Sequence, residues 1–493
     1  MKENIDIADI STKAQYQLNE FLEQLGEKLG DYFGFNVMPQ KLDQQIRVNT
    51  TLNTLSIKSL SLPPHFYEHL TKHLLDKLKK VIKDYIKLYT VPNSNLINNI
   101  IKDLSLYFIF DEYNEKYANF INELKNIGTR SYEGKTVDIG VLYCPNDKAL
   151  TNLQDLKADI VQLPEKKSIA AFFNEEKPFL RLIDNMSLAL IIDSEFKVIA
   201  LLRKRSKEKS LNYTLEKEFN SYLKDKLHNT IINFFFEMIE EALDDHDISN
   251  MKVDFKRWND EQSLKCPEYT YFSLKSNKIN IFTKNDFVLT YYNGDWKLKH
   301  YNIIRSILVN HLFLAKLKPL VKSVIASESD LMFRTFQSII NDTDNFVETL
   351  LRLSQNNVSS IILIDSTQKK SYREKHKKLE QLKVNTVLKN KIQNPNPTYL
   401  NVIKNKKHNM KILNADYYLI ESISSVDGAL VLDADMRIVS FGEIINTEGK
   451  QYPQTYGTGT TAARYASKHC LAIKISEDGD IYIFKNEELK LKI

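Results

Sequence analysis

The sequence predicts an α/β protein, because its apolar residues follow helix spacing in some segments and strand spacing in others. Apolar residues recur at helical spacing through 14–33 and 66–89, whereas short apolar runs such as 188–192 and 198–202 are typical of strands. Six of the thirteen glycines lie between Gly428 and Gly479. Glycine lets the backbone approach a ligand closely, so this segment is where we expect a binding site.

The chain of 493 residues is long enough for about two to four domains, and its pattern changes twice. Residues 1–130 are predicted to be largely helical. Residues 131–290 form a smaller α/β segment with a hairpin at 188–202 and a long helix at 215–243, which includes the buried stretch 231–238. Residues 291–493 form the last α/β domain, in which a mixed sheet has flanking helices.

Three features of the last domain guide its interpretation. The apolar run 361–364 is short enough to be an interior strand, and 429–441 has the spacing of a second hairpin. The polar, proline-interrupted segment 385–409 is expected to be a surface insertion. No repeat of fixed period is visible, although the pairs 188–202 and 429–441 are similar in spacing.

Composition excludes several classes of protein. Net charge is +5, and the basic run 369–378 has no aromatic ladder beside it, so nucleic acid is not indicated as a partner. The three cysteines, Cys144, Cys266 and Cys470, are too far apart to suggest a disulfide framework or a zinc knuckle. Charges near the N-terminus argue against a secretory signal, and no apolar run suggests a membrane span. We therefore expect a cytoplasmic protein that does not bind membranes.

The glycine- and threonine-rich loop predicts an anion-binding site. Gly457, Thr458, Gly459, Thr460 and Thr461 precede a helix that is expected to extend to about residue 469. Free backbone N–H groups and the helix dipole stabilise an anion at such a position, and threonine hydroxyls can donate to phosphate oxygens. The alternative is a plain helix cap whose glycines serve only the turn.

Two common phosphate-binding motifs do not fit this loop. A Walker-type site needs a lysine followed by serine or threonine after the glycines, and this chain has none there. The loop formally matches GxGxxA, with Glu477 about twenty residues further on, but the residues before it do not read as an interior strand.

A carboxylate precedes this loop by about thirty residues. In Asp427-Gly428-Ala429, Asp427 stands at the head of an apolar strand, where its carboxylate could hold Mg²⁺ or Mn²⁺ against the phosphates of a bound nucleotide. The alternative is that Asp-Gly only forms a tight turn.

Together these segments resemble the diadenylate cyclase domain, whose signature is DGA, then a hairpin, then GTRHRAA, then a strand that ends near SEE or SED. The resemblance covers roughly residues 358–485, with 359–364 similar to the family's GALIVI strand and 476–479 similar to its last element. It implies a nucleotide-binding domain of mixed sheet and flanking helices. The nucleotide-binding residues that it implies are Asp427, Gly428, Ala429, Gly457, Thr458, Gly459, Thr460, Thr461, Arg464 and Glu477, with Asp427 as the metal ligand.

The sequence departs from the family at its basic triplet, because Gly459-Thr460-Thr461 stands where Arg-His-Arg is expected. Joining two ATP molecules requires positive charge in the transition state, and threonine hydroxyls supply it poorly. Arg464, one helical turn beyond Thr460, either replaces one lost charge or faces solvent or Glu477. The departure resembles the degenerate members of this superfamily that are thought to act as nucleotide sensors in bacteria.

Three functions follow from these observations. The first is a sensor that binds a nucleotide or a cyclic dinucleotide and signals its occupancy to a partner protein or to a second copy of the chain. The second is an active diadenylate cyclase, which requires a dimer and a metal at Asp427. The third is a structural or protein-interaction role. His376 and His469 are isolated and suggest no catalytic base.

Overall fold

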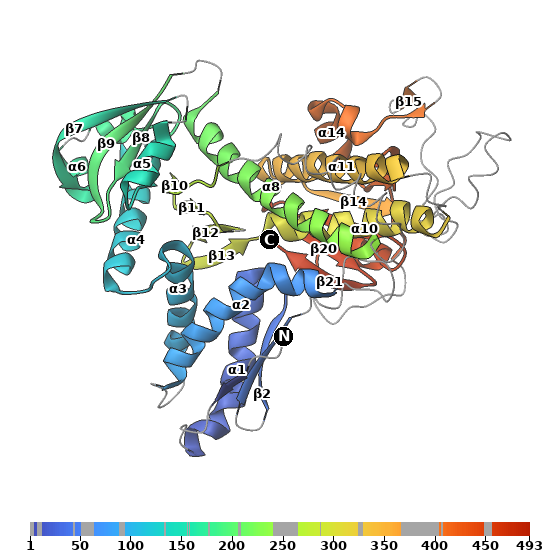
Figure 1. Cartoon of the computed structure of the whole chain (residues 1–493), viewed down its shortest axis with the longest axis horizontal. Coiled ribbons are helices and arrows are strands. Elements are labelled where there is room, and N and C mark those ends of the chain that lie inside the picture. Colours follow the sequence, from blue (N-terminus) through green and yellow to red (C-terminus); the bar gives the residue numbers. More distant parts are fainter. Residues whose placement is uncertain are drawn as a thin grey trace. The chain divides into compact units, whose positions relative to one another are not determined.

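The protein has a mixed α/β fold, as predicted (Figure 1). Contacts divide the computed structural model into two units. The N-terminal unit comprises Met1–Thr50, Glu68–Ile231 and Lys256–Asn302, and the C-terminal unit comprises Thr51–Tyr67, Ile232–Phe255 and Ile303–Ile493. The structure describes residues 4–6, 12–42, 45–50, 64–87, 94–132, 135–154, 156, 158–175, 178–205, 209–239, 265–285, 287–323, 329–365, 404–405, 408–447 and 456–493.

The first 130 residues contain the predicted helices and also a small sheet. The helices are α1 (Thr12–Phe33), α2 (Pro64–Lys87), α3 (Ser94–Phe110) and α4 (Glu115–Gly128). Strands β1 (Asn4–Asp6), β2 (Val37–Leu42) and β3 (Gln45–Thr50) form an antiparallel sheet in the order β1-β3-β2. This sheet was not expected, because β2 contains Pro39 and the alternation in β3 rests on only two apolar residues, Ile46 and Val48.

An eight-stranded sheet forms the centre of the N-terminal unit, in the order β13-β12-β11-β10-β6-β8-β9-β7. Only β6 and β8 pair in parallel within this sheet, and the predicted hairpin at 188–202 is confirmed as β8 and β9. The predicted domain boundary after residue 290 falls inside β12, and contacts assign the chain as far as Asn302 to this unit. The strands are β6 (Asp138–Tyr143), β7 (Ala158–Ser168), β8 (Leu188–Ile192), β9 (Lys197–Lys204), β10 (Thr270–Lys275), β11 (Lys278–Phe282), β12 (Val288–Tyr292) and β13 (Asp295–Lys299).

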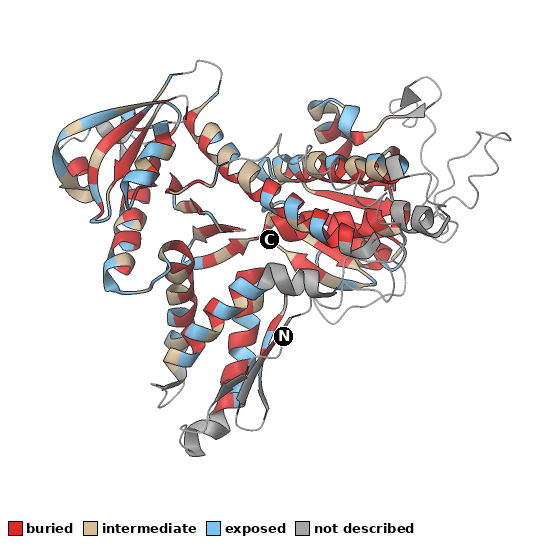
Figure 2. Ribbon diagram, in the orientation of Figure 1, coloured by how far each residue is buried: buried red, intermediate tan, exposed pale blue. Residues whose placement is uncertain are grey.

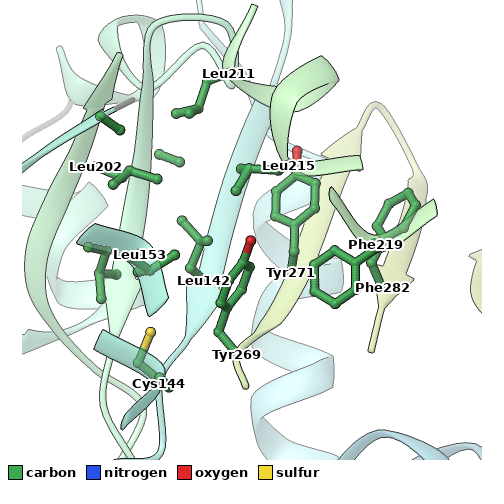
Figure 3. Packing of buried hydrophobic residues seen from close by; sticks show 14 of the residues in the cluster. Leu142, Cys144, Leu153, Leu202, Leu211, Leu215, Phe219, Tyr269, Tyr271 and Phe282 are labelled. Carbon is green, nitrogen blue, oxygen red and sulfur yellow. The ribbon is translucent and has the colours of Figure 1, made fainter. Parts of the chain in front are cut away.

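Short elements and one long helix complete this unit. They are the strand pair β4 (Ser131–Tyr132) and β5 (Lys135–Thr136) and the helices α5 (Asp147–Gln154), α6 (Ile169–Glu175), α7 (Phe179–Leu182) and α8 (Leu211–Ile239). Leu211, Leu215 and Phe219 of α8 pack with Leu142 and Tyr271 of the sheet (Figure 3). Phe234, Phe235 and Phe236 are buried on α8, which confirms the prediction of a buried helix in this stretch.

The C-terminal unit is built on a six-stranded sheet in the order β18-β17-β14-β19-β20-β21. Strands β14 and β17 are parallel, and their other neighbours are antiparallel. Every residue of β14 and of β19 is buried, so both faces of the sheet centre are covered (Figure 2). The strands are β14 (Ser360–Asp365), β17 (Ala429–Asp433), β18 (Ile438–Glu443), β19 (Leu471–Ile475), β20 (Ile481–Lys485) and β21 (Glu488–Lys492).

The remaining elements of this unit are mostly helical. They are α10 (Tyr301–Ser323), α11 (Ser329–Gln355), the pair β15 (Lys404–Asn405) and β16 (His408–Asn409), the 3-10 helix η3 (Ile412–Asn414), α14 (Tyr417–Ser424) and α15 (Thr458–Ala466). The predicted insertion at 385–409 lies outside the described residues, apart from β15 and β16. Within the described ranges no helix is long and apolar enough to cross a membrane.

The two sheets share one topology. Each has a central parallel pair, a hairpin that begins with the second strand of that pair, and an antiparallel meander beside the first strand. Strands β6, β8, β9, β10, β11 and β12 thus correspond to β14, β17, β18, β19, β20 and β21, and α8 corresponds to α15. The registers of the parallel pairs agree as well. Val141 of β6 pairs with Leu190 of β8, and their counterparts Ile362 of β14 and Leu430 of β17 pair with each other. The connecting segments differ in length, which explains why the sequence shows no fixed period.

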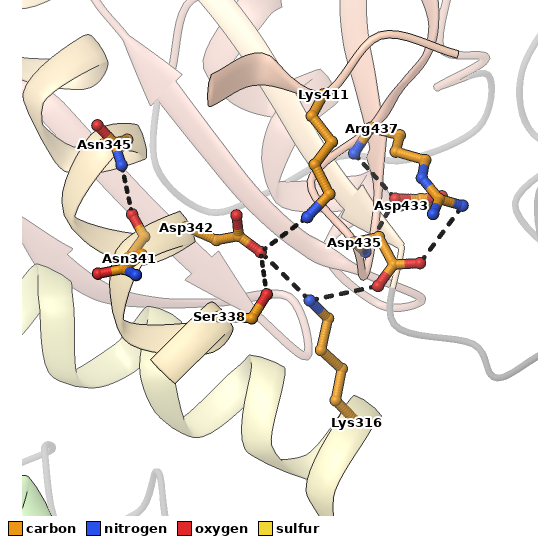
Figure 4. Close-up of polar contacts among 9 residues, drawn as sticks. All are labelled: Lys316, Ser338, Asn341, Asp342, Asn345, Lys411, Asp433, Asp435 and Arg437. Carbon is orange, nitrogen blue, oxygen red and sulfur yellow. Dashed lines mark hydrogen bonds and ion pairs between the residues drawn. The ribbon is translucent and has the colours of Figure 1, made fainter. Parts of the chain in front are cut away.

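A charge network at the β17–β18 turn ties two helices to the sheet (Figure 4). Asp342 of α11 is 2% exposed and lies 3.4 Å from Lys316 of α10 and 3.6 Å from Lys411. Lys316 also lies 3.3 Å from Asp435 in the turn. This network stabilises the end of the sheet at which β14 and β17 terminate, and Gly428 lies at the opposite end.

Candidate functional site

The predicted segments 427–429 and 457–461 lie near the amino-terminal ends of β14 and β17, whereas Arg464 is directed elsewhere. One register row crosses the sheet there, because Glu443 pairs with Ala429, Ala429 with Ile361, and Ile361 with Lys474. Neighbouring strands lie about 4.8 Å apart, so Ala429 is about 10 Å from Lys474. Ala429 and Ile361 belong to the apolar cluster that includes Ala463 of α15. The row therefore lies on the face of the sheet that α15 covers.

Gly428 is required by the backbone at this edge. Its φ is +110°, and a Cβ there would lie 2.6 Å from the carbonyl carbon of Gly442 and 2.8 Å from the amide nitrogen of Glu443. Only glycine adopts this conformation so close to a neighbouring strand. Asp427, the residue before it, is exposed at the edge of the sheet.

The first turn of α15 is open to an anion. Gly457 is the N-cap, no side chain caps the helix, and the first turn holds no acidic residue. Gly457 and Thr458 are exposed, whereas Thr460 and Thr461 are half-buried. The amide of Thr461 donates to the carbonyl of Gly457 at 3.0 Å, so the amides before it are those that a ligand can use.

Lys474 of β19 lies directly beneath this turn. A Cβ on Gly459 would be 3.2 Å from Cε and 3.4 Å from Nζ of Lys474, and 3.9 Å from Cδ1 of Ile361. The absence of a side chain at position 459 thus lets the first turn of the helix approach the ammonium group. The sequence alone predicts no cation here apart from Arg464.

The charge of Lys474 is buried and poorly compensated. The residue is 8% exposed, and Nζ donates to Oγ of Ser359 at 2.6 Å. Within the described chain Lys474 makes no ion pair. Desolvation lowers the pKa of Lys474, and the carboxylate of Glu477 counteracts this through Coulombic attraction. A buried cation with one hydroxyl partner is stabilised by any anion that reaches it.

Glu443 is the buried acid at the other end of the row. It is 2% exposed, and its Oε2 has no hydrogen-bond partner within the described chain. Desolvation raises the pKa of Glu443 to about 7, while a hydrogen bond with Ser440 lowers it. Near neutral pH this carboxyl group therefore carries only part of a full charge.

Glu477 lies near the site, whereas the side chain of Arg464 is directed away from it. Nε of Arg464 donates to the carbonyl of Glu487 at 2.7 Å, and its guanidinium lies 5.7 Å from the ring centroid of Tyr456. The guanidinium is therefore directed to the β20–β21 turn. Glu477 is exposed in the turn after β19 and acts on Lys474 through its charge.

The described residues do not form a metal site of their own. No group of three or more histidine, cysteine, aspartate or glutamate side chains gathers anywhere in the described ranges. Asp427 could fill one coordination position, which suits Mg²⁺ that a nucleotide brings with it, because such ions use one or two carboxylates together with phosphate oxygens. Mg²⁺ or Mn²⁺ thus fits only as part of a bound nucleotide. Cys144, Cys266 and Cys470 are free thiols.

The N-terminal unit fills the equivalent position with its own side chains. Ser273 of β10 pairs with Gly140 of β6, as Lys474 pairs with Ile361, so Ser273 is the counterpart of Lys474. Nδ2 of Asn185 donates to Oγ of Ser273 at 3.1 Å, and a Cβ on Gly140 would lie 2.2 Å from Oδ1 of Asn185.

The helix that corresponds to α15 is also satisfied internally. In α8 the amide of Leu211 donates to the carbonyl of Met186 at 2.7 Å, and the amide of Asn212 donates to the carbonyl of Asn185 at 3.0 Å. Two of the amides that an anion would use are therefore taken. The anion-binding features are thus open in the C-terminal unit and closed in the N-terminal one.

Lys474, Ser359 and Glu443 were missed by the sequence analysis. A weak signal exists for Lys474, since it is a charged residue within the apolar strand Leu471–Ile475. Its meaning depends on the register between β14 and β19, whose paired residues lie more than a hundred positions apart. No local pattern contains that information.

The comparisons with known proteins leave the family open. Neither a protein-family model nor a curated protein matches the sequence. Among solved structures, the chain is similar to a hypothetical membrane spanning protein from Bacillus cereus, with 15% sequence identity and a TM-score of 0.21 over 39% of this chain and 91% of that one. A likeness at this level supports no argument about fold or function. The resemblance to the diadenylate cyclase domain stays a prediction.

Proposed function

We propose that the C-terminal unit binds a nucleotide or a cyclic dinucleotide, and that the protein is a sensor rather than a cyclase. The observation that carries this proposal is the convergence of separate segments on one edge of a sheet. Ala429, which follows Gly428, and the buried cation Lys474 lie on one register row, and the uncapped first turn of α15 packs over Ile361 and Lys474 of that row.

A phosphate group is the ligand that fits this end of the sheet. The first turn of α15 offers backbone amides and a dipole equivalent to about half a positive charge. The hydroxyls of Thr458, Thr460 and Thr461 can add hydrogen bonds to phosphate oxygens. Asp427 can hold Mg²⁺ or Mn²⁺ when the ligand carries several phosphates.

The sensor role rests on the charges that are missing. Threonines stand where the diadenylate cyclase family carries its basic triplet, and the guanidinium of Arg464 contacts the carbonyl of Glu487. One lysine does not replace three cationic groups in the transition state of phosphoryl transfer. A ligand that binds one conformation better than another would transmit its occupancy to a partner or to a second copy of the chain, in the cytoplasm.

Calorimetry on the full-length protein tests this proposal. The titrants are ATP, GTP, cyclic di-AMP and cyclic di-GMP, each with and without Mg²⁺. The variant Thr460→Val, Thr461→Val should weaken binding, because it removes two hydroxyls from the first turn of α15. Thr349→Val is the matched control, since its hydroxyl donates to its own helix at Asn345. Failure of every titrant to bind the wild-type protein would remove the proposal.

A further inference from the structure

The site has a small and unusual set of charges. Its buried cation is Lys474, and its two exposed carboxylates are Asp427 and Glu477. The next lysine along the same row, Lys492, is paired with Asp480 at 3.7 Å, and the buried Glu443 adds part of a negative charge. The helix dipole adds about half a positive charge at the first turn of α15. A ligand with several negative charges would therefore meet more negative than positive side chains unless it brought a metal.

We propose that Lys474 is the phosphate-binding cation of this site and that it selects a nucleotide phosphodiester, which carries one negative charge per phosphorus, over a nucleoside triphosphate. This inference rests on the proposed function and narrows its ligand. A single anionic oxygen can pair with Nζ of Lys474 while the neighbouring oxygen accepts from the amides of α15.

Geometry supports this assignment in two ways. Nζ would lie 3.4 Å from a Cβ on Gly459, so the ammonium and the open amides of the first turn share one small space. Nζ has one hydroxyl partner, Oγ of Ser359, and an ammonium can donate three hydrogen bonds. The remaining donors match the two unesterified oxygens of a phosphodiester.

The charge balance decides the class of ligand. Burying further phosphate charges without partners is costly, because each loses its hydration. A triphosphate therefore needs Mg²⁺ at Asp427 to bind here, whereas a phosphodiester does not. Removal of Mg²⁺ should thus weaken the binding of a triphosphate and leave the binding of a phosphodiester unchanged.

The repeat of the fold sets the stoichiometry. The counterpart of Lys474 in the N-terminal unit is Ser273, and Asn185 donates to its hydroxyl at 3.1 Å. Ser273 is uncharged and its hydroxyl already accepts a hydrogen bond from Asn185, so this position provides no cation for an anion. One ligand should bind per chain.

The experiment is calorimetry of the full-length chain in EDTA and in Mg²⁺, with cyclic di-AMP, 3′,5′-cyclic AMP, 5′-AMP and ATP. In EDTA at least one of the two phosphodiesters should bind at one per chain and more tightly than ATP. The two phosphodiester arms separate a cyclic dinucleotide from a cyclic mononucleotide.

Lys474→Met should lower the affinity for the phosphodiester by about 10- to 100-fold, which is the range expected for losing a hydrogen bond to a charged group. The melting temperature of the ligand-free variant should stay the same or rise, because an apolar side chain replaces a buried, poorly compensated cation. Lys468→Met, on an exposed lysine beside α15, is the control and should leave affinity unchanged.

Gly459→Ala provides a second variant that keeps the charge. Its methyl group would displace the end of Lys474 and should weaken binding, whereas Gly30→Ala on α1, where nothing lies within 4 Å of a Cβ, is the control outside the site. Two results would overturn the inference and leave the proposed function standing. One is that ATP in EDTA binds more tightly than both phosphodiesters, and the other is that Lys474→Met binds the phosphodiester with full affinity. Absence of all binding would overturn both.

Discussion

Asp193 and Asp433 make the same hydrogen bonds at equivalent positions of the two sheets. In each residue Oδ1 accepts from two backbone amides of the hairpin turn that the residue begins, at distances of 2.9–3.0 Å. The donors are Glu195 and Lys197 in the first turn and Asp435 and Arg437 in the second. The repeated topology therefore extends to the geometry of single turns.

The backbone of these turns agrees as well. Phe196 and Met436 each precede the second strand of their hairpin and have φ values of 57° and 55°. A non-glycine residue in this region is uncommon and requires support from its surroundings. Both side chains are buried, which supplies that support.

Loss of either aspartate should destabilise its own hairpin. Asp193→Ala and Asp433→Ala each remove an acceptor of two amide hydrogen bonds, so each should cost about 1–2 kcal/mol of unfolding free energy. Asp193→Asn and Asp433→Asn keep one oxygen and should lose less. Urea unfolding measures the loss of stability, and hydrogen exchange shows whether it is confined to the hairpin that was changed. Unchanged stability in either alanine variant would contradict the equivalence of the two aspartates.

Gly428→Ala should destabilise the C-terminal unit by more than the cost of its positive φ alone. A conformation of this kind costs about 1–3 kcal/mol for a residue with a Cβ. At Gly428 the Cβ would also lie 2.6 Å from backbone, whereas at Gly294, with a φ of +95°, nothing lies within 4 Å. Gly294→Ala is therefore the matched control, and equal losses in urea unfolding would show that the contact with Gly442 is unimportant.

Glu443 should make the C-terminal unit less stable as pH rises. Its pKa is raised to about 7, above the ordinary value of 4.5, so the folded state holds the proton more tightly than the unfolded state. The stabilisation is complete below about pH 4.5 and is lost as pH rises through about 7, by up to about 3 kcal/mol. Glu443→Gln should lack this component, which urea midpoints between pH 4.5 and 8 would reveal; parallel curves for the two proteins would refute it.

Asp342 should be much more important than Asp435 in the charge network. Asp342 is 2% exposed and lies near two lysines, while Asp435 is 46% exposed. Removing one partner of a buried network costs about 3–5 kcal/mol, whereas an exposed pair contributes about 0–1 kcal/mol. Thermal unfolding of Asp342→Ala and Asp435→Ala compares them, and similar losses would contradict the burial argument.

The sequence predicts those elements whose signal is local. The hairpin at β8 and β9 and the buried helix through Phe235 were both expected from the spacing of apolar residues, and the structure confirms them. The small sheet of β2 and β3 was not expected, because Pro39 and its polar neighbours conceal the alternation.

The site was predicted in part for the same reason. Gly428 and Gly457 stand out in the sequence because glycine is rare elsewhere in the chain. Lys474 does not, because its position beneath α15 follows from the pairing of β14 with β19 and from the packing of a helix on both. Such relations between distant segments are set by tertiary structure and have no local pattern.

The most direct test of the account is hydrogen–deuterium exchange of the full-length protein with and without cyclic di-AMP, with cyclic AMP and ATP in parallel. The amides of Thr458 and Gly459 should become protected, as should β19 around Lys474, because the ligand would accept hydrogen bonds from the first turn of α15. The equivalent region around Leu211 and Ser273 should not change. Protection confined to other segments, or no protection with any of the three nucleotides, would contradict the claim that this edge of the C-terminal sheet binds phosphate.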